Sequence, residues 1–277
     1  MRPRRSCLSV PASSGKMLEK ARTLPADEVV IDLEDSVPPG AKDAARAAAA
    51  AAVRESWKAP AVAVRVNAVG GEWWERDVGD LAAAGGSLSS LVIPKCQGPD
   101  GVLAVDSLLD GEIGIQALIE TAAGLVAVRE IASSSERLES LIVGFADLAA
   151  SLGRPAAAEY PGDRWHFARE TVLVNARAAG LAAIDGPYLA IEDEDGLRAS
   201  AAEARALGYD GKWAIHPSQL EPLNELFTPN ADEVDRARAV LGALDGAAGA
   251  AALEGEMIDE ASRKQAEIVV ARAEAAG

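Results

Sequence analysis

Apolar, β-branched runs recur along the first 216 residues and alternate with Ala-rich stretches of helical composition. This alternation is typical of parallel strands joined by helical crossovers. Eight strand-plus-helix units predict an α/β fold of the closed TIM (β/α)8 barrel type rather than an open doubly wound sheet. The expected strands are residues 5–10, 28–33, 61–67, 89–94, 113–119, 139–145, 184–191 and 212–216.

Helices are expected between these strands. Residues 41–54 form one, after a "PPG" turn, and residues 164–179 form another that ends at Gly180, where glycine allows a left-handed stop. The Ala tract at 47–52 is a strong helix former within the first of these crossovers.

The pattern changes after the eighth strand. Residues 230–242 predict a helix, Gly242 to Gly255 an Ala/Gly-rich hinge, and residues 258–276 a second helix. We therefore expect the barrel to occupy residues 1–228 and a C-terminal helical extension to occupy residues 229–277.

Composition narrows the class of protein. A chain of 277 residues with 49% hydrophobic content can fill one large core, and its net charge of −16 disfavours nucleic acid and anionic membrane surfaces as partners. No apolar run approaches the ~20 residues of a membrane span, and the start "MRPRRS" does not lead into a signal peptide, so we expect a cytoplasmic protein. Cys7 and Cys96 are too few for a disulfide framework or a zinc site, and we expect two buried thiols.

Polar side chains follow the predicted strands, for example Glu120 in "ALIETAAGL" and Asp147, which comes about one strand-plus-helix unit later. In a barrel, residues at these positions share the C-terminal face, where active sites lie. Any single carboxylate of this kind is more simply a solvated acid or half of an ion pair, but together they predict a polar site. The set comprises Asp32, Glu34, Asp35, Arg65, Asn67, Lys95, Glu120, Asp147 and His216.

Glu120 and Asp147 would lie on neighbouring strands, close enough to share one divalent cation. Two carboxylates without His or Cys favour Mg²⁺ over Zn²⁺, because Mg²⁺ keeps several waters and takes other ligands from substrate. Arg65 would supply a fixed cation for a carboxylate or a developing enolate oxygen. The alternative for Arg65 is a salt bridge across the barrel mouth to Glu34 or Asp35.

Several motifs occur in a specific order and spacing along nearly the whole chain. They are "RSCLSVPASSGKMLEKA", "VVIDLEDSVPPGAKDAAR", "VAVRVN", "LVIPK", "ALIETAAGL", "GFADLAASLG", "GYDGKWAIHPSQLEPLNELFTP" and "GEMID". Together they resemble the HpcH/HpaI aldolase and citrate lyase β-subunit-like (CitE-like) family, which includes citryl-CoA, malyl-CoA and citramalyl-CoA lyases. The resemblance implies a Mg²⁺-dependent carbon–carbon lyase acting on a CoA thioester, in a homotrimer or homohexamer.

The resemblance also assigns roles. It implies that Glu120 and Asp147 hold the metal, that Arg65 and Glu120 bind substrate, and that the extension is a lid. That lid would place Asp259 of "GEMID" over a neighbouring subunit's active site for proton transfer; without the resemblance, Asp259 is an ordinary acid at a helix start.

Four further residues complete the predicted substrate site. Asp35 and Lys95 lie at its rim, and the start of the helix after the eighth strand, at Pro217, suits phosphate or pantetheine contact. His216 fits equally well as a ligand and as a loop histidine with a local partner.

Departures from the family pattern leave the substrate open. Ser9-Val10-Pro11-Ala12 stands where "FVPG" is usual, and Ala146 and Ser151 lack charges that the family carries beside the metal. The expected partners are therefore a small CoA thioester and a keto acid of unspecified identity. Two other functions remain open: a metal-dependent pyruvate-type aldolase acting on free keto acids, and a non-catalytic CoA-binding subunit of a lyase complex.

Overall fold

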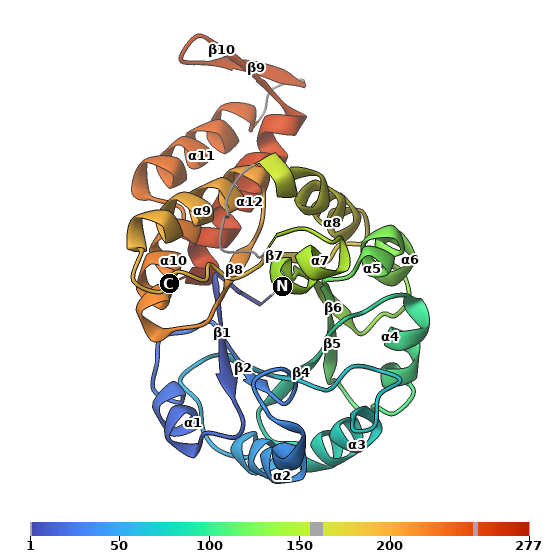
Figure 1. Cartoon of the computed structure of the whole chain (residues 1–277). Coiled ribbons are helices and arrows are strands. Elements are labelled where there is room, and N and C mark those ends of the chain that lie inside the picture. Colours follow the sequence, from blue (N-terminus) through green and yellow to red (C-terminus); the bar gives the residue numbers. More distant parts are fainter. Residues whose placement is uncertain (1, 156–162, 246–248, 277) are drawn as a thin grey trace.

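Eight parallel strands form a closed barrel surrounded by helices in the computed structural model, which describes residues 2–155, 163–245 and 249–276 (Figure 1). Neighbours in sequence are neighbours in the barrel, and β1 closes the ring by pairing with β8, where Ser6 lies opposite Lys212. The predicted fold class is therefore confirmed. The strands are β1 (Ser6–Pro11), β2 (Glu28–Asp32), β3 (Ala61–Arg65), β4 (Leu88–Ile93), β5 (Gly114–Ile119), β6 (Leu138–Val143), β7 (Ala182–Asp185) and β8 (Gly211–Ala214).

Helices cover the outside of this barrel. The second predicted crossover helix ends where expected, since Gly180 adopts a left-handed φ of 72° just after it. The α-helices are α1 (Gly15–Ala21), α2 (Lys42–Ala52), α3 (Trp74–Ala84), α4 (Pro99–Asp106), α5 (Ala122–Val126), α6 (Val128–Ala132), α7 (Phe145–Ser151), α8 (His166–Ala178), α9 (Glu194–Leu207) and α10 (Leu220–Phe227). Short 3₁₀ turns are η1 (Pro39–Ala41), η3 (Asp163–Trp165) and η4 (Pro217–Gln219).

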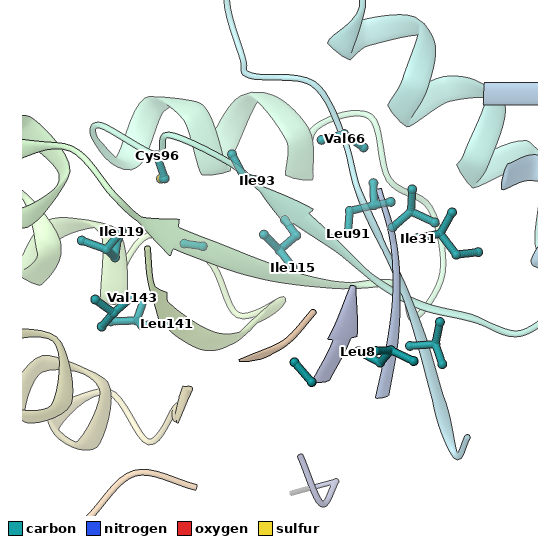
Figure 2. Packing of buried hydrophobic residues seen from close by; sticks show 14 of the residues in the cluster. Leu8, Ile31, Val66, Leu91, Ile93, Cys96, Ile115, Ile119, Leu141 and Val143 are labelled. Carbon is teal, nitrogen blue, oxygen red and sulfur yellow. The ribbon is translucent and has the colours of Figure 1, made fainter. Parts of the chain in front are cut away.

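Strand residues alternate between two apolar layers, as the period of a β-strand requires. One set packs with the surrounding helices, and Figure 2 shows Leu8, Ile31 and Leu91 among its members. The other set, which includes Val30 and Trp213, fills the barrel interior. Cys7 and Cys96 are free and buried, as expected.

The seventh strand differs from its prediction. Residues 184–191 were expected to be extended, but β7 covers Ala182–Asp185. Gly186 passes close to β6, where an added Cβ would lie 2.6 Å from the Val143 carbonyl, and Pro187 has no N–H to continue the ladder. The apolar residues after Pro187 are therefore loop residues.

The C-terminal extension consists of α11 (Ala231–Leu244), an antiparallel hairpin of β9 (Ala250–Leu253) and β10 (Glu256–Asp259), and α12 (Glu260–Ala276). The hairpin corrects the predicted hinge at residues 242–255, of which residues 246–248 lie outside the described residues. The two helices pack on each other around a small core of their own, and the hairpin projects away from the barrel (Figure 1). Among the described residues, no helix is both long and apolar enough to cross a membrane.

Candidate active site at the C-terminal face of the barrel

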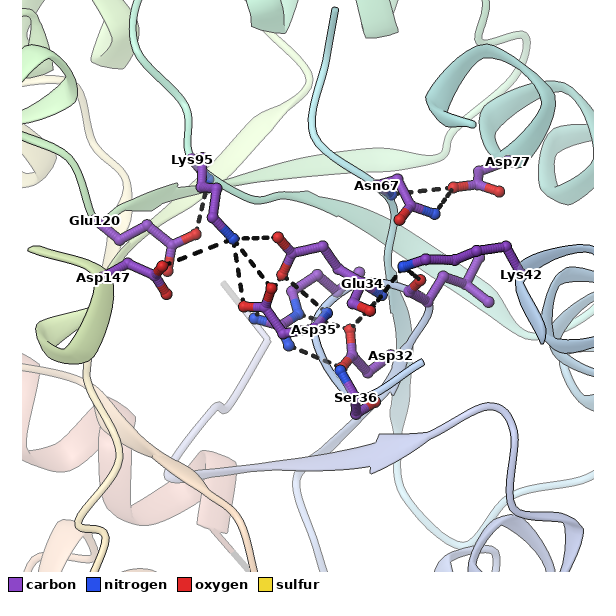
Figure 3. A network of polar contacts seen from close by, with 12 residues as sticks. Asp32, Glu34, Asp35, Ser36, Lys42, Asn67, Asp77, Lys95, Glu120 and Asp147 are labelled. Carbon is purple, nitrogen blue, oxygen red and sulfur yellow. Dashed lines mark hydrogen bonds and ion pairs between the residues drawn. The ribbon is translucent and has the colours of Figure 1, made fainter. Parts of the chain in front are cut away.

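The predicted polar residues converge where the strands end. Figure 3 shows the side chains that follow β2, β4 and β5 meeting around Lys95, together with an acid from α7. Glu120 directly follows β5, and β5 pairs with β6, whose end leads into α7. Asp147 lies in the first turn of α7 rather than at the strand end itself. Glu120 and Asp147 therefore come from neighbouring strand-to-helix junctions, as expected, although Asp147 belongs to the helix and not to the strand.

Arg65 is fixed by Asp32 at the end of β2. Its Nε and one terminal nitrogen donate to the two Asp32 oxygens at 2.7 and 2.8 Å, a bidentate pair, and the other terminal nitrogen lies 3.3 Å from Glu34 Oε2. Burial acts to lower the pKa of Arg65, but Asp32 outweighs it, so that the pKa rises and the charge is permanent. The salt-bridge alternative is thus correct for Glu34, whereas the main partner, Asp32, was not anticipated.

Lys95 connects the carboxylates of the site through two different groups. Its main-chain N–H donates to Glu120 Oε1 at 2.8 Å. Its backbone φ of 48° is in the left-handed region, which is uncommon for residues other than glycine. Its ammonium donates to Glu34 and Asp35 and lies 3.8 Å from Asp147 Oδ1. A non-glycine residue in this conformation is consistent with a functional constraint.

Glu120 is a buried carboxylate with little compensation. It is 2% exposed, and burial together with the charge of Asp147 raises its pKa to about 8. Gly144, which follows β6, makes room for it, because a Cβ there would lie 2.5 Å from Glu120 Oε2. The sequence gives Gly144 no visible role, although its place between a strand and a helix could have drawn attention to it.

This pair of acids fits Mg²⁺. Across the described residues, no three His, Cys, Asp or Glu side chains are grouped as metal ligands, and Glu120 and Asp147 are the two acids of this site that would hold the ion. Mg²⁺ accepts such a site because it retains waters and shares oxygens with substrate. A cation between the two carboxylates would also relieve the repulsion that raises the pKa of Glu120.

The turn after β2 is held by two groups: Asp32, which belongs to the predicted polar set, and Lys42, which the sequence did not single out. Asp32 accepts hydrogen bonds from the N–H groups of Glu34 and Ser36, and the Lys42 ammonium donates to the carbonyls of Leu33 and Glu34, both at 2.7 Å. Asn67, in contrast, donates to Asp77 of α3 and supports the barrel wall.

Two of the predicted residues have local partners. His216 caps η4, where its Nδ1 accepts from the Ser218 N–H at 3.2 Å, and Pro217 is the first residue of that turn. The loop-histidine alternative therefore accounts for the contacts of His216, and the suggested phosphate contact at Pro217 stays a prediction.

Asp259 lies outside the cluster. Its Oδ1 accepts from the N–H groups of Ala261 and Ser262 at the start of α12, at the end of a hairpin that points away from its own barrel (Figure 1). Within this chain, Asp259 therefore caps the start of α12.

Comparisons with known proteins show the family and the fold. Residues 5–217 match the HpcH/HpaI aldolase/citrate lyase family. The chain is 37% identical to an L-malyl-CoA/β-methylmalyl-CoA lyase of Cereibacter sphaeroides, over 99% of this chain and 95% of that protein, and 34% identical to the citrate lyase β subunit of Escherichia coli, over 100% and 95%. Its fold matches a crystal structure of CitE from Mycobacterium tuberculosis in complex with magnesium, acetoacetate and coenzyme A, with a TM-score of 0.81, 33% identity, and coverage of 99% and 98% of the two chains. The chain belongs to the HpcH/HpaI aldolase/citrate lyase family.

Proposed function

We propose that this protein is a Mg²⁺-dependent carbon–carbon lyase that cleaves, or in reverse forms, a β-hydroxyacyl-CoA thioester such as malyl-, citramalyl- or citryl-CoA. The products of cleavage are a keto acid and an acyl-CoA. The observation that carries the proposal is the buried Glu120 beside Asp147: its pKa is raised although Arg65, fixed by Asp32, and the Lys95 ammonium lie near the pair. Relatives named as CoA-thioester lyases support it.

The acids and the cations of the site would have different roles. Glu120 and Asp147 would hold Mg²⁺, which when bound supplies a Lewis acid that polarises substrate oxygens. Cleavage requires loss of the hydroxyl proton, breakage of the C–C bond to give the keto acid, and protonation of the thioester enolate carbon. Arg65, held by Asp32 in one orientation, would stabilise the enolate oxygen as its charge develops. Lys95 and Asp35, at the rim, would orient the substrate's polar groups.

The proton for the enolate carbon would come from Asp259 of a second copy. The hairpin that carries Asp259 points away from its own barrel, which leaves a neighbouring subunit as the place where it could close a site (Figure 1). Treating residues 229–277 as a lid on a barrel of residues 1–228 therefore belongs to this proposal. Trimeric or hexameric assembly and a cytoplasmic location stay predictions.

Two alternatives lead to different results in the same assay. A pyruvate-type aldolase would act on free keto acids without CoA, and a non-catalytic subunit would bind CoA without turnover. The thioester itself is open, because a pocket distinguishes one methyl group by only ~1–3 kcal/mol.

The test is a panel of thioesters assayed with Mg²⁺ or with excess chelator, following free CoA and keto acid separately. We expect keto acid to form without free CoA, only with Mg²⁺, and not in Glu120→Gln or Asp147→Asn. Glu221→Gln, an exposed acid on α10, is the matched control and should keep full activity. Turnover in chelator, or in either site variant, would refute the proposal.

A mixing experiment tests the shared site. Asp259→Ala and Asp147→Ala should each be inactive, whereas mixed oligomers should recover part of the activity, because some pair an intact lid with an intact metal site. No recovery after confirmed subunit exchange would exclude a lid that acts on its neighbour.

A further inference from the structure

The Lys95 ammonium lies between two groups of acids. On one side it donates to Glu34 and, at 3.3 Å, to both oxygens of Asp35; on the other it lies 3.8 Å from Asp147 (Figure 3). The nearer group is Glu34 and Asp35, and the metal pair, Glu120 and Asp147, lies on the other side. The position of this single positive charge therefore depends on how strongly Glu34 attracts it.

An ammonium within ion-pair distance of metal ligands competes with the metal for them. Lys95 has a flexible four-carbon side chain, and a short rotation would bring its charge fully onto Asp147 or Glu120. In the described part of the chain, Asp147 has no other side-chain cation within salt-bridge distance, and Glu120 has none. They would therefore accept the ammonium readily if Glu34 released it.

Glu34 is held in place from behind by a rigid turn. The Lys42 ammonium donates to two carbonyls of this turn and lies 5.3 Å from the centre of the Trp73 ring, and the residue is only 6% exposed. The Asp32 carboxylate accepts hydrogen bonds from two N–H groups of the same turn. With both ends of the turn bonded, the Glu34 side chain has a fixed origin between Arg65 and Lys95.

We propose that Glu34 is a positioning residue for the metal site: its carboxylate retains the Lys95 ammonium and so leaves the Glu120–Asp147 pair free for Mg²⁺, while Lys42 holds the main chain of Glu34. Lys42 acts one step further back, through the turn that carries Glu34. The inference rests on the proposed metal site and adds that Glu34 sets how tightly this site binds Mg²⁺.

Calorimetric titration with Mg²⁺ alone, without substrate, tests the competition. Glu34→Gln keeps the shape of the side chain but releases Lys95, so we expect Mg²⁺ affinity to fall by about tenfold. Lys42→Met should lower the affinity in the same direction. The decisive variant is Glu34→Gln/Lys95→Ala, in which no competitor remains, and its affinity should return to within about threefold of Lys95→Ala alone.

Glu233→Gln is the control, because Glu233, a half-buried acid, is bonded to an arginine as Glu34 is, at the contact between α9 and α11 far from the metal pair. It should leave Mg²⁺ affinity unchanged. Unchanged affinity in Glu34→Gln, or no recovery in the double variant, would overturn the inference, since Glu34 would then act only through its own charge or not at all. Failure of the metal site itself is recognised separately, because Glu120→Gln would then bind Mg²⁺ as tightly as the wild type.

Discussion

Glu120 and Asp185 are both buried carboxylates at the ends of barrel strands, at 2% and 0% exposure, yet their surroundings are opposite. Asp185 accepts from Arg169 at 3.1 and 2.8 Å and from Lys212 at 2.5 Å. Burial acts to raise the pKa of Asp185, but Lys212 and Arg169 outweigh it and hold the pKa below its ordinary value. Glu120 receives one main-chain N–H and faces another acid, and its pKa rises to about 8.

This difference in bonded cations distinguishes a carboxylate that is part of the fold from one that is available to a ligand. Asp185 faces the helical layer, where α8 supplies Arg169, and its charge is neutralised within the fold. Glu120 lies at the barrel mouth, where its donor is a main-chain N–H and no side-chain cation of the described residues is bonded to it. A buried acid with its own cations therefore stabilises the barrel, whereas one without them indicates a ligand site.

The largest expected effect is on stability. Asp185→Asn leaves Lys212 and Arg169 without their shared acid and should lower the free energy of unfolding by about 3–5 kcal/mol. Because the pKa of Asp185 is lowered in the folded state, its contribution is complete above the ordinary value of about 3.9 and is lost as pH falls through the folded pKa. In urea denaturation, the difference in unfolding free energy between the wild type and Asp185→Asn should therefore be constant from pH 8 to pH 5. A loss below about 1 kcal/mol would contradict the structural role.

Arg65→Lys tests the other side of the comparison. Lysine keeps the charge but loses the planar fork that Asp32 orients, so turnover should fall by about 10²–10³ while substrate binding changes less. Steady-state kinetics separates the two effects. Weakened binding with unchanged turnover would make Arg65 a ground-state anchor instead.

The smallest expected effect comes from Gly144→Ala. The added methyl group would meet Glu120 and displace its carboxylate, and we expect Mg²⁺ affinity to fall by about tenfold, or ~1.4 kcal/mol. Gly242→Ala in α11, where a Cβ meets nothing within 4 Å, is the control and should bind Mg²⁺ normally. Equal affinities in the two variants would mean that Glu120 is not held tightly enough for its position to matter.

The sequence predicted most of the barrel and the centre of its site. Apolar periodicity located the strands closely except for β7, of which the prediction covered only the end. Parallel order alone brought the residues after β5 and β6 together, which is why Glu120 and Asp147 could be paired. The C-terminal hairpin was missed because "AAAL" has neither strand alternation nor β-branched residues, and its pairing depends on contact with "EMID".

The supporting contacts could not be predicted in the same way. Asp32 follows a strand as the functional acids do, and only the structure shows that it binds Arg65 and caps a turn. Lys42 occupies a helix start, where a lysine is ordinarily solvated, and its two carbonyl partners are set by how the turn folds back on α2. Such partners depend on three-dimensional packing rather than on local pattern.

The most direct test of the uncompensated acid compares the unfolding free energies of the wild type and Glu120→Gln, with chelator and with Mg²⁺. Because the pKa of Glu120 is raised to about 8 in the folded state, metal-free wild type should lose stability as pH rises from about 4.5 to 8, and the variant should not. At pH 8.5 in chelator we therefore expect Glu120→Gln to be more stable by roughly 2–4 kcal/mol, and Mg²⁺ to stabilise only the wild type. A wild type that is the more stable protein in chelator at this pH, or a variant that gains as much from Mg²⁺, would contradict the account.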